Sequence, residues 1–381
     1  MAGPAPSWRG RRIAALTSLR FFAAIGIVLA HYSSTLTLPN QTASHALVAL
    51  AGSTVPLFFI LSGFVLTLQY DAAFGADASS ALQRYVRARV ARIVPLYWLA
   101  LALTAAAYLA TDFRVSLGGD AHSVGKFTSF VLSVFALQAW VPSTSVQQFW
   151  NAPGWSVSAE VFFYALLPLL LGTGGRWLSG SARSVATVLA LGWVASGAYF
   201  IAVRVAAPGD VDWVGYGVRL PLLGLPAFML GIALARRHMA RPQHRGWWGS
   251  AMWPALLLPV SALCLVDPKA PFEQGWLLTQ WVWVPLFGWL VWTLADEQRR
   301  TSRWLAARWL VLLGDSSYAL YLIHWLPLGF VLRGYLGAPT PWLGPTVIVA
   351  LVLASVLLHR HFEEPLRRWF IRSASPNANT P

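Results

Sequence analysis

The chain has 381 residues, of which 57% are hydrophobic and only 11% are charged, and this composition excludes an ordinary soluble protein. Its formal net charge of +14 comes from short basic clusters between apolar segments, a pattern that is typical of a membrane protein and excludes a nucleic-acid partner. The single cysteine, Cys264, excludes an internal disulfide and a cysteine-based metal site.

Ten apolar stretches are each long enough, at about 20 residues, to cross a bilayer. They predict an all-α polytopic membrane protein with about ten transmembrane helices. A further apolar piece, residues 127–140, is short, and we interpret it as a re-entrant or shallow segment. In chain order, the predicted spans are residues 13–38, 47–70, 93–111, 155–171, 185–205, 218–235, 252–266, 276–295, 309–332 and 342–359.

The charged residues between the spans predict their orientation. With ten crossings, every basic cluster falls on one side of the membrane, whereas the other side receives Asp112, Asp120, Asp210, Asp212, Asp267 and Glu273. Counting residues 127–140 as a crossing would place the basic cluster 236–245 outside, against the positive-inside rule. We therefore expect a multi-pass protein of the inner (cytoplasmic) membrane with both termini in the cytoplasm.

The chain is expected to form one unit. Its sequence contains no internal repeat, long linker or soluble domain, so residues 1–372 are predicted to form a single membrane domain, followed by a disordered tail at 373–381. The N-terminal region lacks the pattern of a signal-peptide cleavage site, so the first span is predicted to be retained.

Two ionisable residues stand out in the first predicted span. Arg20 and His31 are eleven residues apart, which on an α-helix returns them to nearly the same face with a rise of about 16 Å. Ionisable groups inside a bilayer are costly and usually serve a function. The pair therefore indicates chemistry that is carried out across the membrane, with His31 toward the outer side.

Acidic residues are rare within the predicted spans, where only Glu160 and Asp315 occur. Glu160 follows the outer start of its span by five residues, which places it at the predicted depth of His31. A carboxylate that holds the imidazole would fix its tautomer and raise its basicity, as a general base requires. We therefore expect Glu160 to lie close to His31, with a polar channel leading from the arginines to this pair.

A second basic motif begins the third predicted span. Arg89 and Arg92 are three residues apart and lie on one helix face. Paired guanidinium groups bind phosphates in a bidentate manner. The motif therefore predicts a phosphate-binding site at the cytoplasmic end of the bundle.

Several well-known catalytic patterns are missing from the sequence. It contains no G-x-S-x-G elbow, no H-E-x-x-H zinc motif and no P-loop, so neither a serine-nucleophile nor a metal mechanism is expected.

Six motifs in the same order resemble those of the acyltransferase-3 family of integral membrane acyltransferases. These enzymes acylate bacterial surface glycans or small molecules, and the resemblance covers nearly the whole chain. The matching segments are R-x10-H at residues 20–31, PLFFILSGF at 56–64, R-x-x-R at 89–92, WSVSAE at 155–160, SYALYLIH at 317–324 and FEEPLRR at 362–368.

The sequence also departs from the family pattern at two positions. Val161 stands where a second acid commonly follows Glu160, and Pro56 stands where many members carry a polar residue. The chain stops after its last predicted span, without the SGNH-type domain that some members carry. We therefore expect a stand-alone transferase, which acylates its acceptor directly or passes the acyl group to a separate protein.

The resemblance implies an acyl-CoA-dependent O-acyltransferase in the lipid bilayer. It would move an acyl group, most simply acetyl, from cytoplasmic acyl-CoA to a hydroxyl of a glycan or glycolipid at the outer face, with acyl-CoA as co-substrate and no bound cofactor. His31 would act as general base or carry the acyl group transiently, Glu160 would hold it, and Arg20 would line the donor path. The donor-binding residues would be Arg89, Arg92 and Tyr97, and the further pocket residues Trp155, Ser156, Tyr318 and His324.

Two alternatives remain open at this point. One is a transporter or flippase for a lipid-linked sugar, with Arg20, His31 and Glu160 as a proton relay. The other is an acyltransferase that modifies a small-molecule natural product.

Overall fold

The computed structural model describes residues 12–38, 43–44, 47, 54–76, 78–111, 125–172, 175–207, 211–240, 282–332, 334–336 and 340–372. Within these ranges the chain is helical and contains no β-strand. The helices are α1 (Ala14–His31), α3 (Val55–Ala76), α4 (Ala78–Thr111), α5 (Lys126–Val134), α6 (Thr144–Gln148), α7 (Gly154–Leu171), α8 (Ala182–Ala206), α9 (Val211–Arg219), α10 (Pro221–Ala240), α14 (Val284–Leu294), α15 (Arg300–Leu305), α16 (Arg308–Ile323), α17 (Trp325–Leu332), α18 (Leu343–Leu358) and α19 (Glu364–Arg372). Three short helical turns join them: η1 (Ser33–Thr35), η2 (Gln138–Trp140) and η5 (His359–Glu363).

The all-α polytopic architecture predicted from the sequence is confirmed. Seven helices of the described residues are long and apolar enough to cross a membrane, and α14 is a shorter apolar helix. The predicted span 252–266, with Cys264, lies outside the described residues, as does the tail 373–381. Residues 127–140 form α5 and η2, and nine residues of helix cover about 14 Å, less than half of a hydrocarbon core of about 30 Å.

One predicted span is divided. Residues 309–332 form two helices, because α16 ends at Ile323 and α17 begins at Trp325. The interruption falls at His324, whose surroundings are described below.

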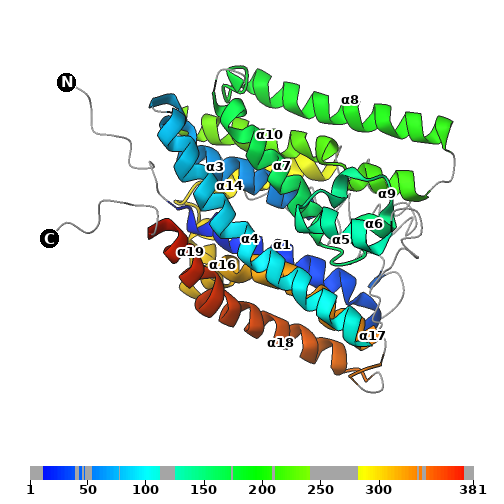
Figure 1. Ribbon diagram of the computed structural model, residues 1–381. Coiled ribbons are helices and arrows are strands. Elements are labelled where there is room, and N and C mark those ends of the chain that lie inside the picture. The colour runs from blue at the N-terminus through cyan, green and yellow to red at the C-terminus, as the bar shows by residue number, and fades with distance from the viewer. Residues whose placement is uncertain are drawn as a thin grey trace.

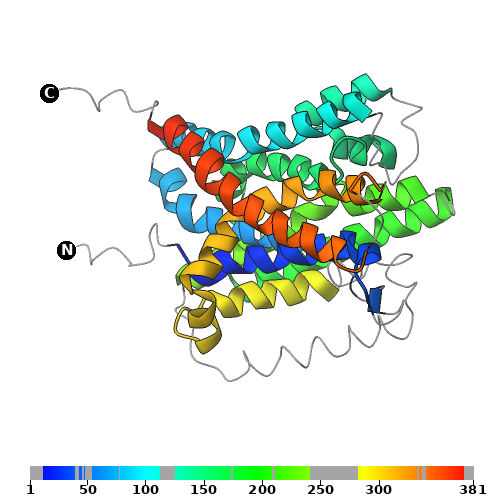
Figure 2. The same cartoon turned by 90° about the horizontal axis from the view of Figure 1, so that it is seen from below.

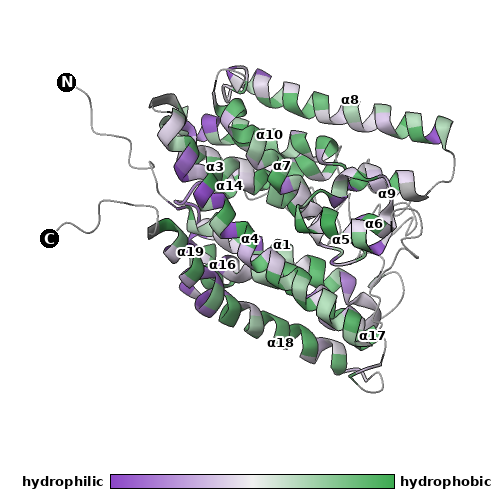
Figure 3. Ribbon diagram, viewed as in Figure 1, coloured by the Kyte–Doolittle hydropathy of each residue, from purple (hydrophilic) through white to green (hydrophobic). Residues whose placement is uncertain are grey.

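The helices run roughly along one axis, with α1 inside the bundle and α8 and α18 on its outside (Figures 1 and 2). The start of α1 and the end of α19 lie at the same end of the bundle. Hydrophilic residues gather at that end, whereas the outer helices are mostly hydrophobic (Figure 3). Large apolar side chains of α8 and α18 are exposed, among them Val194, Ile201, Val349 and Leu353, as expected for helices that face lipid.

Small residues set the spacing of the central helix pairs. A Cβ added to Gly63 of α3 would lie 2.1 Å from the carbonyl oxygen of Phe228 in α10, and one added to Gly314 of α16 would lie 2.1 Å from that of Thr17 in α1. Close backbone approach at small residues is a general device of membrane helix packing. The contact at Gly314 holds the helix with Arg20 and His31 against α16.

Replacing Gly314 by alanine should therefore push α1 and α16 apart. Overpacking typically costs about 1–3 kcal/mol, and here the obstacle is backbone, so we expect a lower thermal midpoint of the purified protein. Ala102→Val, at an exposed position of α4, is the steric control and should leave the midpoint unchanged. An unaltered midpoint in Gly314→Ala would contradict the close approach.

Candidate active site

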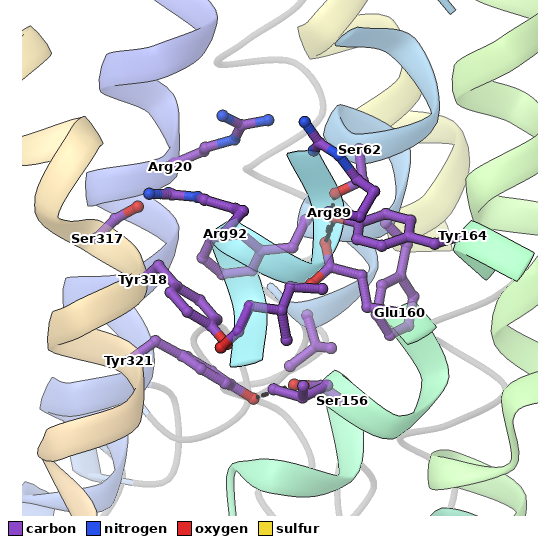
Figure 4. Close-up of a pocket in the computed structure, with 15 residues that line it drawn as sticks. Arg20, Ser62, Arg89, Arg92, Ser156, Glu160, Tyr164, Ser317, Tyr318 and Tyr321 are labelled. Carbon is purple, nitrogen blue, oxygen red and sulfur yellow. Dashed lines mark hydrogen bonds between the residues drawn. The ribbon is translucent and has the colours of Figure 1, made fainter. Parts of the chain in front are cut away.

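Five helices, α1, α3, α4, α7 and α16, surround a cavity of about 100 Å³ in the middle of the bundle (Figure 4). Regular helix spacing presents its polar side chains, since residues three or four apart share a face. Arg89 and Arg92 follow this spacing on α4, and Ser156, Glu160 and Tyr164 follow it on α7. The full set of polar lining residues is Arg20, Ser62, Arg89, Arg92, Ser156, Glu160, Tyr164, Ser317, Tyr318 and Tyr321.

Three guanidinium groups gather at one end of the cavity, opposite the hydroxyls of Ser156 and Tyr321 (Figure 4). Two of them, Arg20 and Arg89, make no hydrogen bond or ion pair with any other described residue, and Nε of Arg89 is buried without a partner. The guanidinium of Arg89 lies 5.7 Å from the centroid of the Tyr164 ring. Buried donors are costly when unpaired, so this end of the cavity is suited to an anionic ligand.

Arg92 differs from the other two arginines because a carboxylate neutralises it. It forms an ion pair with Glu363 of η5 and lies 5.4 Å from the centroid of the Tyr318 ring. Glu363 is 2% exposed and its second oxygen is 3.0 Å from Nδ1 of His359. Glu363 thus connects the C-terminal helices to the cavity.

Glu160 lies among the arginines rather than beside His31. Its Oε1 accepts hydrogen bonds from Ser62 Oγ at 2.6 Å and from the Tyr164 hydroxyl at 2.7 Å. The expectation that Glu160 holds the imidazole of His31 is therefore wrong for this structure. The partner of His31 is His324, with 2.9 Å between Nδ1 of His31 and Nε2 of His324.

The error arises from the position of α7. The residues just before this helix, Asn151 and Ala152, are buried, and the hydroxyl of Ser156 contacts the buried Tyr321. Helix α7 therefore starts inside the protein rather than at the membrane surface, and Glu160, one turn further along, lies deeper than its distance from the start of the span suggests.

His31 does not line the cavity. Tyr321 lines the cavity, and its hydroxyl is bonded to Ser156 at 2.8 Å. Its ring centroid is 5.9 Å from that of His324, the partner of His31. The cavity thus extends from the arginines to the Tyr321–Ser156 pair (Figure 4) and does not include His31.

The other predicted pocket residues divide into two groups. Ser156 and Tyr318 line the cavity, as expected, whereas Tyr97, Trp155 and His324 do not. The Tyr97 hydroxyl donates to the Ser133 carbonyl at 2.7 Å and accepts from Gln138 at 3.1 Å, so it ties α4 to the α5–η2 segment. Trp155 packs edge-on against Phe59. No group of three or more metal-binding side chains occurs in the part of the chain that the structure describes.

Sequence reasoning did not single out five residues of the site: Ser62, Tyr164, Ser317, Tyr321 and Glu363. Four of them lie inside the motifs at 56–64, 317–324 and 362–368, where they were read as parts of a pattern only. The fifth, Tyr164, is four residues beyond Glu160, and that spacing could have indicated it as the neighbour of the carboxylate.

Comparison with known proteins decides the family. A family model described as an acyltransferase domain, acyltransferase 3, matches residues 13–360. The chain belongs to this family. Together with its apolar helices, membership makes it a multi-pass membrane acyltransferase.

The relatives differ in length. The chain is 26% identical to acyltransferase MdmB of Streptomyces mycarofaciens over 94% of this chain and 92% of the relative. It is 26% identical to the exopolysaccharide production protein ExoZ of Rhizobium meliloti over 86% of this chain and 93% of the relative. It is 20% identical to the O-acetyltransferase OatA of Staphylococcus aureus over 94% of this chain but only 58% of the relative. No solved structure matches the chain.

Proposed function

We propose that this protein is an O-acyltransferase of the inner membrane that uses cytoplasmic acyl-CoA, most simply acetyl-CoA, to acylate a hydroxyl of a glycan or glycolipid at the outer face. The observation that carries the proposal is the cavity end with three guanidinium groups, two of them without a hydrogen-bonded partner among the described residues. Guanidinium groups bind phosphates through paired hydrogen bonds, and acyl-CoA is an acyl donor that carries phosphates.

The size of the cavity assigns a part of the donor to it. About 100 Å³ is well below the roughly 300–1,000 Å³ of a site that encloses a drug-sized ligand. The cavity therefore holds a phosphate group or the narrow pantetheine arm, and the nucleotide stays at the mouth. The thioester then points toward Tyr321, Ser156 and, beyond them, His31.

His31 supplies the base of the reaction. Its imidazole takes the proton of the acceptor hydroxyl as the oxygen attacks the thioester carbonyl carbon. The carbon–sulfur bond breaks, and the CoA thiolate leaves and takes up the proton. A glycan acceptor is supported by the name of one relative, the exopolysaccharide production protein ExoZ. Transfer of an acetyl group to oxygen is supported by the name of the longer O-acetyltransferase OatA.

The function is tested with purified protein in lipid nanodiscs, acetyl-CoA with a labelled acetyl group, and a panel of lipid-linked glycans and hydroxylated natural products. We expect label in a glycan and release of one CoA per acetyl group transferred. Label only in a natural product would overturn the glycan acceptor. Movement of a lipid-linked sugar across the bilayer without acylation would overturn the enzymatic function.

Donor binding gives a separate prediction. Arg89→Ala should weaken binding of CoA about 10- to 100-fold, because a hydrogen bond to a charged group contributes about 1.5–3 kcal/mol. It should also reduce the dependence of affinity on salt, which screens phosphate contacts, and Arg89→Lys should restore binding only in part because lysine lacks the planar fork.

The matched control is Arg84→Ala on the same helix, an exposed residue whose guanidinium bonds to Ser80 at 3.1 Å. It should bind CoA as the unaltered protein does in direct calorimetric titration. Equal affinities of Arg84→Ala and Arg89→Ala would show that Arg89 only anchors the helix at the membrane surface.

A further inference from the structure

The break between α16 and α17 holds His324 in one position. The last carbonyls of a helix lack partners within it, and here side chains supply three contacts. Asn151 donates to the carbonyl oxygen of Leu322 at 3.2 Å. The hydroxyl of the buried Tyr32 donates to the backbone carbonyl oxygen of His324 at 3.0 Å. The imidazole of His324, which is 0% exposed, contacts the carbonyl oxygen of Tyr321 through Nδ1 at 2.7 Å.

The contact with Tyr321 determines where His324 carries its hydrogen. A carbonyl oxygen can only accept, so Nδ1 of His324 must be the donor, and in the neutral ring Nε2 carries the lone pair. That nitrogen is 2.9 Å from Nδ1 of His31. Since one of the two nitrogens must donate, Nδ1 of His31 bears a hydrogen.

The ring geometry supports a directed hydrogen bond. The two imidazole planes are within 14° of each other and their centroids are 5.1 Å apart. This separation is close to the largest that two five-membered rings can have when their nitrogens are 2.9 Å apart. The two nitrogens thus lie almost on the line between the rings, as the direction of the lone pair requires.

The consequence concerns the other nitrogen of His31. With its hydrogen on Nδ1, the neutral ring has a free lone pair on Nε2. No described residue hydrogen-bonds to Nε2, and this atom is not among the fully buried unpaired ones. Trp325 packs edge-on against the ring at 5.2 Å between centroids, which fixes its orientation.

We propose that His324 is a positioning residue that sets the tautomer of His31, so that Nε2 of His31 is presented as the base to the acceptor hydroxyl. The role in catalysis rests on the proposed function, whereas the tautomer itself does not. A protonated His324 would reverse the hydrogen bond and place the hydrogen of His31 on Nε2. Burial of His324, without a carboxylate in contact among the described residues, favours the neutral ring, because an unpaired charge there would be costly.

Two substitutions separate this role from a structural one. The amide nitrogen of an asparagine side chain can occupy the position of Nδ1 of His324, but the side chain does not reach the position of Nε2. His324→Asn can therefore keep the bond to the Tyr321 carbonyl but loses the acceptor for His31. Glutamine reaches the level of Nε2 and offers an amide oxygen there, so His324→Gln restores that acceptor. Binding of CoA and the thermal midpoint, measured for both variants, verify that each is folded.

The primary readout is the nitrogen spectrum of 15N-histidine-labelled protein in nanodiscs, with the His31 signals assigned by difference from a His31→Ala sample. We expect His31 in the Nδ1–H form in the unaltered protein and in His324→Gln, and a shift toward the Nε2–H form, which the side chain of free histidine prefers, in His324→Asn. The maximal rate of acyl transfer should fall about 10- to 100-fold in His324→Asn, a loss of the size seen when the hydrogen-bond partner of a metal-ligating histidine is removed. It should recover in His324→Gln, with the KM for acyl-CoA unchanged throughout.

An Nε2–H form of His31 in the unaltered protein, or a spectrum of His31 that is the same in His324→Asn, would overturn the proposal. So would equal rates of the asparagine and glutamine variants. If instead the proposed function is incorrect, the expected tautomer of His31 would be observed but no acyl group would reach any acceptor.

Discussion

Replacing His31 by alanine should lower acyl transfer by about 10²–10⁴-fold, the usual contribution of a general base. The imidazole is the group that removes the proton of the acceptor in the proposed reaction, and the neighbouring His324 lies behind it, 2.9 Å from its Nδ1 and 0% exposed. Binding of CoA should persist, since the arginine cavity does not include His31.

Single-turnover transfer from labelled acetyl-CoA measures the rate, and calorimetry measures the CoA affinity of the same preparation. The matched control is His361→Ala, which removes an exposed imidazole at the far end of the bundle and should leave both quantities unchanged. Substantial turnover in purified His31→Ala would remove this residue from the mechanism. A joint loss of turnover and CoA affinity would indicate misfolding or a role in the donor site.

The sequence predicted the fold well because span length and the charge of the loops are local properties. The predicted spans 155–171, 185–205, 309–332 and 342–359 agree with helices at both ends to within three residues, whereas α3 begins eight residues later and α4 begins 15 residues earlier than predicted. The break at His324 was missed because the apolar run through residues 309–332 is continuous in sequence. Pro327 in the first turn of α17 is a local signal for the interruption, because it cannot donate a hydrogen bond to the carbonyl four residues before it. The contacts of Tyr32 and Asn151 then hold the carbonyls near His324.

The site was predicted where its residues share one helix. Arg89 and Arg92 line the same cavity, as their spacing on one face requires. Pairing across helices was not predictable in this way, because it depends on depth. Glu160 was placed near His31 by counting from the membrane surface, and the recessed start of α7 brings it instead to Ser62 and Tyr164.

Breaking the ion pair of Arg92 and Glu363 should lower the stability of the protein whichever partner is replaced, but should weaken donor binding only when Arg92 is replaced. Removing one partner of a buried pair costs about 3–5 kcal/mol, because the other charge is left uncompensated. Glu363 is 2% exposed, so both Arg92→Ala and Glu363→Gln should lower the thermal midpoint. Arg368→Ala, which removes the exposed partner of Glu364, is the control and should cost no more than about 1 kcal/mol.

The two variants should differ in their affinity for CoA. Arg92→Ala removes a cation from the cavity and should weaken binding about 10- to 100-fold, whereas Glu363→Gln frees the guanidinium of Arg92 and should leave binding equal or tighter. The double variant Arg92→Ala/Glu363→Gln should regain part of the lost stability, because no buried charge is then unpaired, but it should bind CoA as weakly as Arg92→Ala. Calorimetric titration measures the affinity for CoA, and thermal unfolding measures the stability, of the unaltered protein, the two single variants and the double variant. If affinity falls equally in both single variants and returns with stability in the double variant, Arg92 serves the packing of the C-terminal helices rather than the donor.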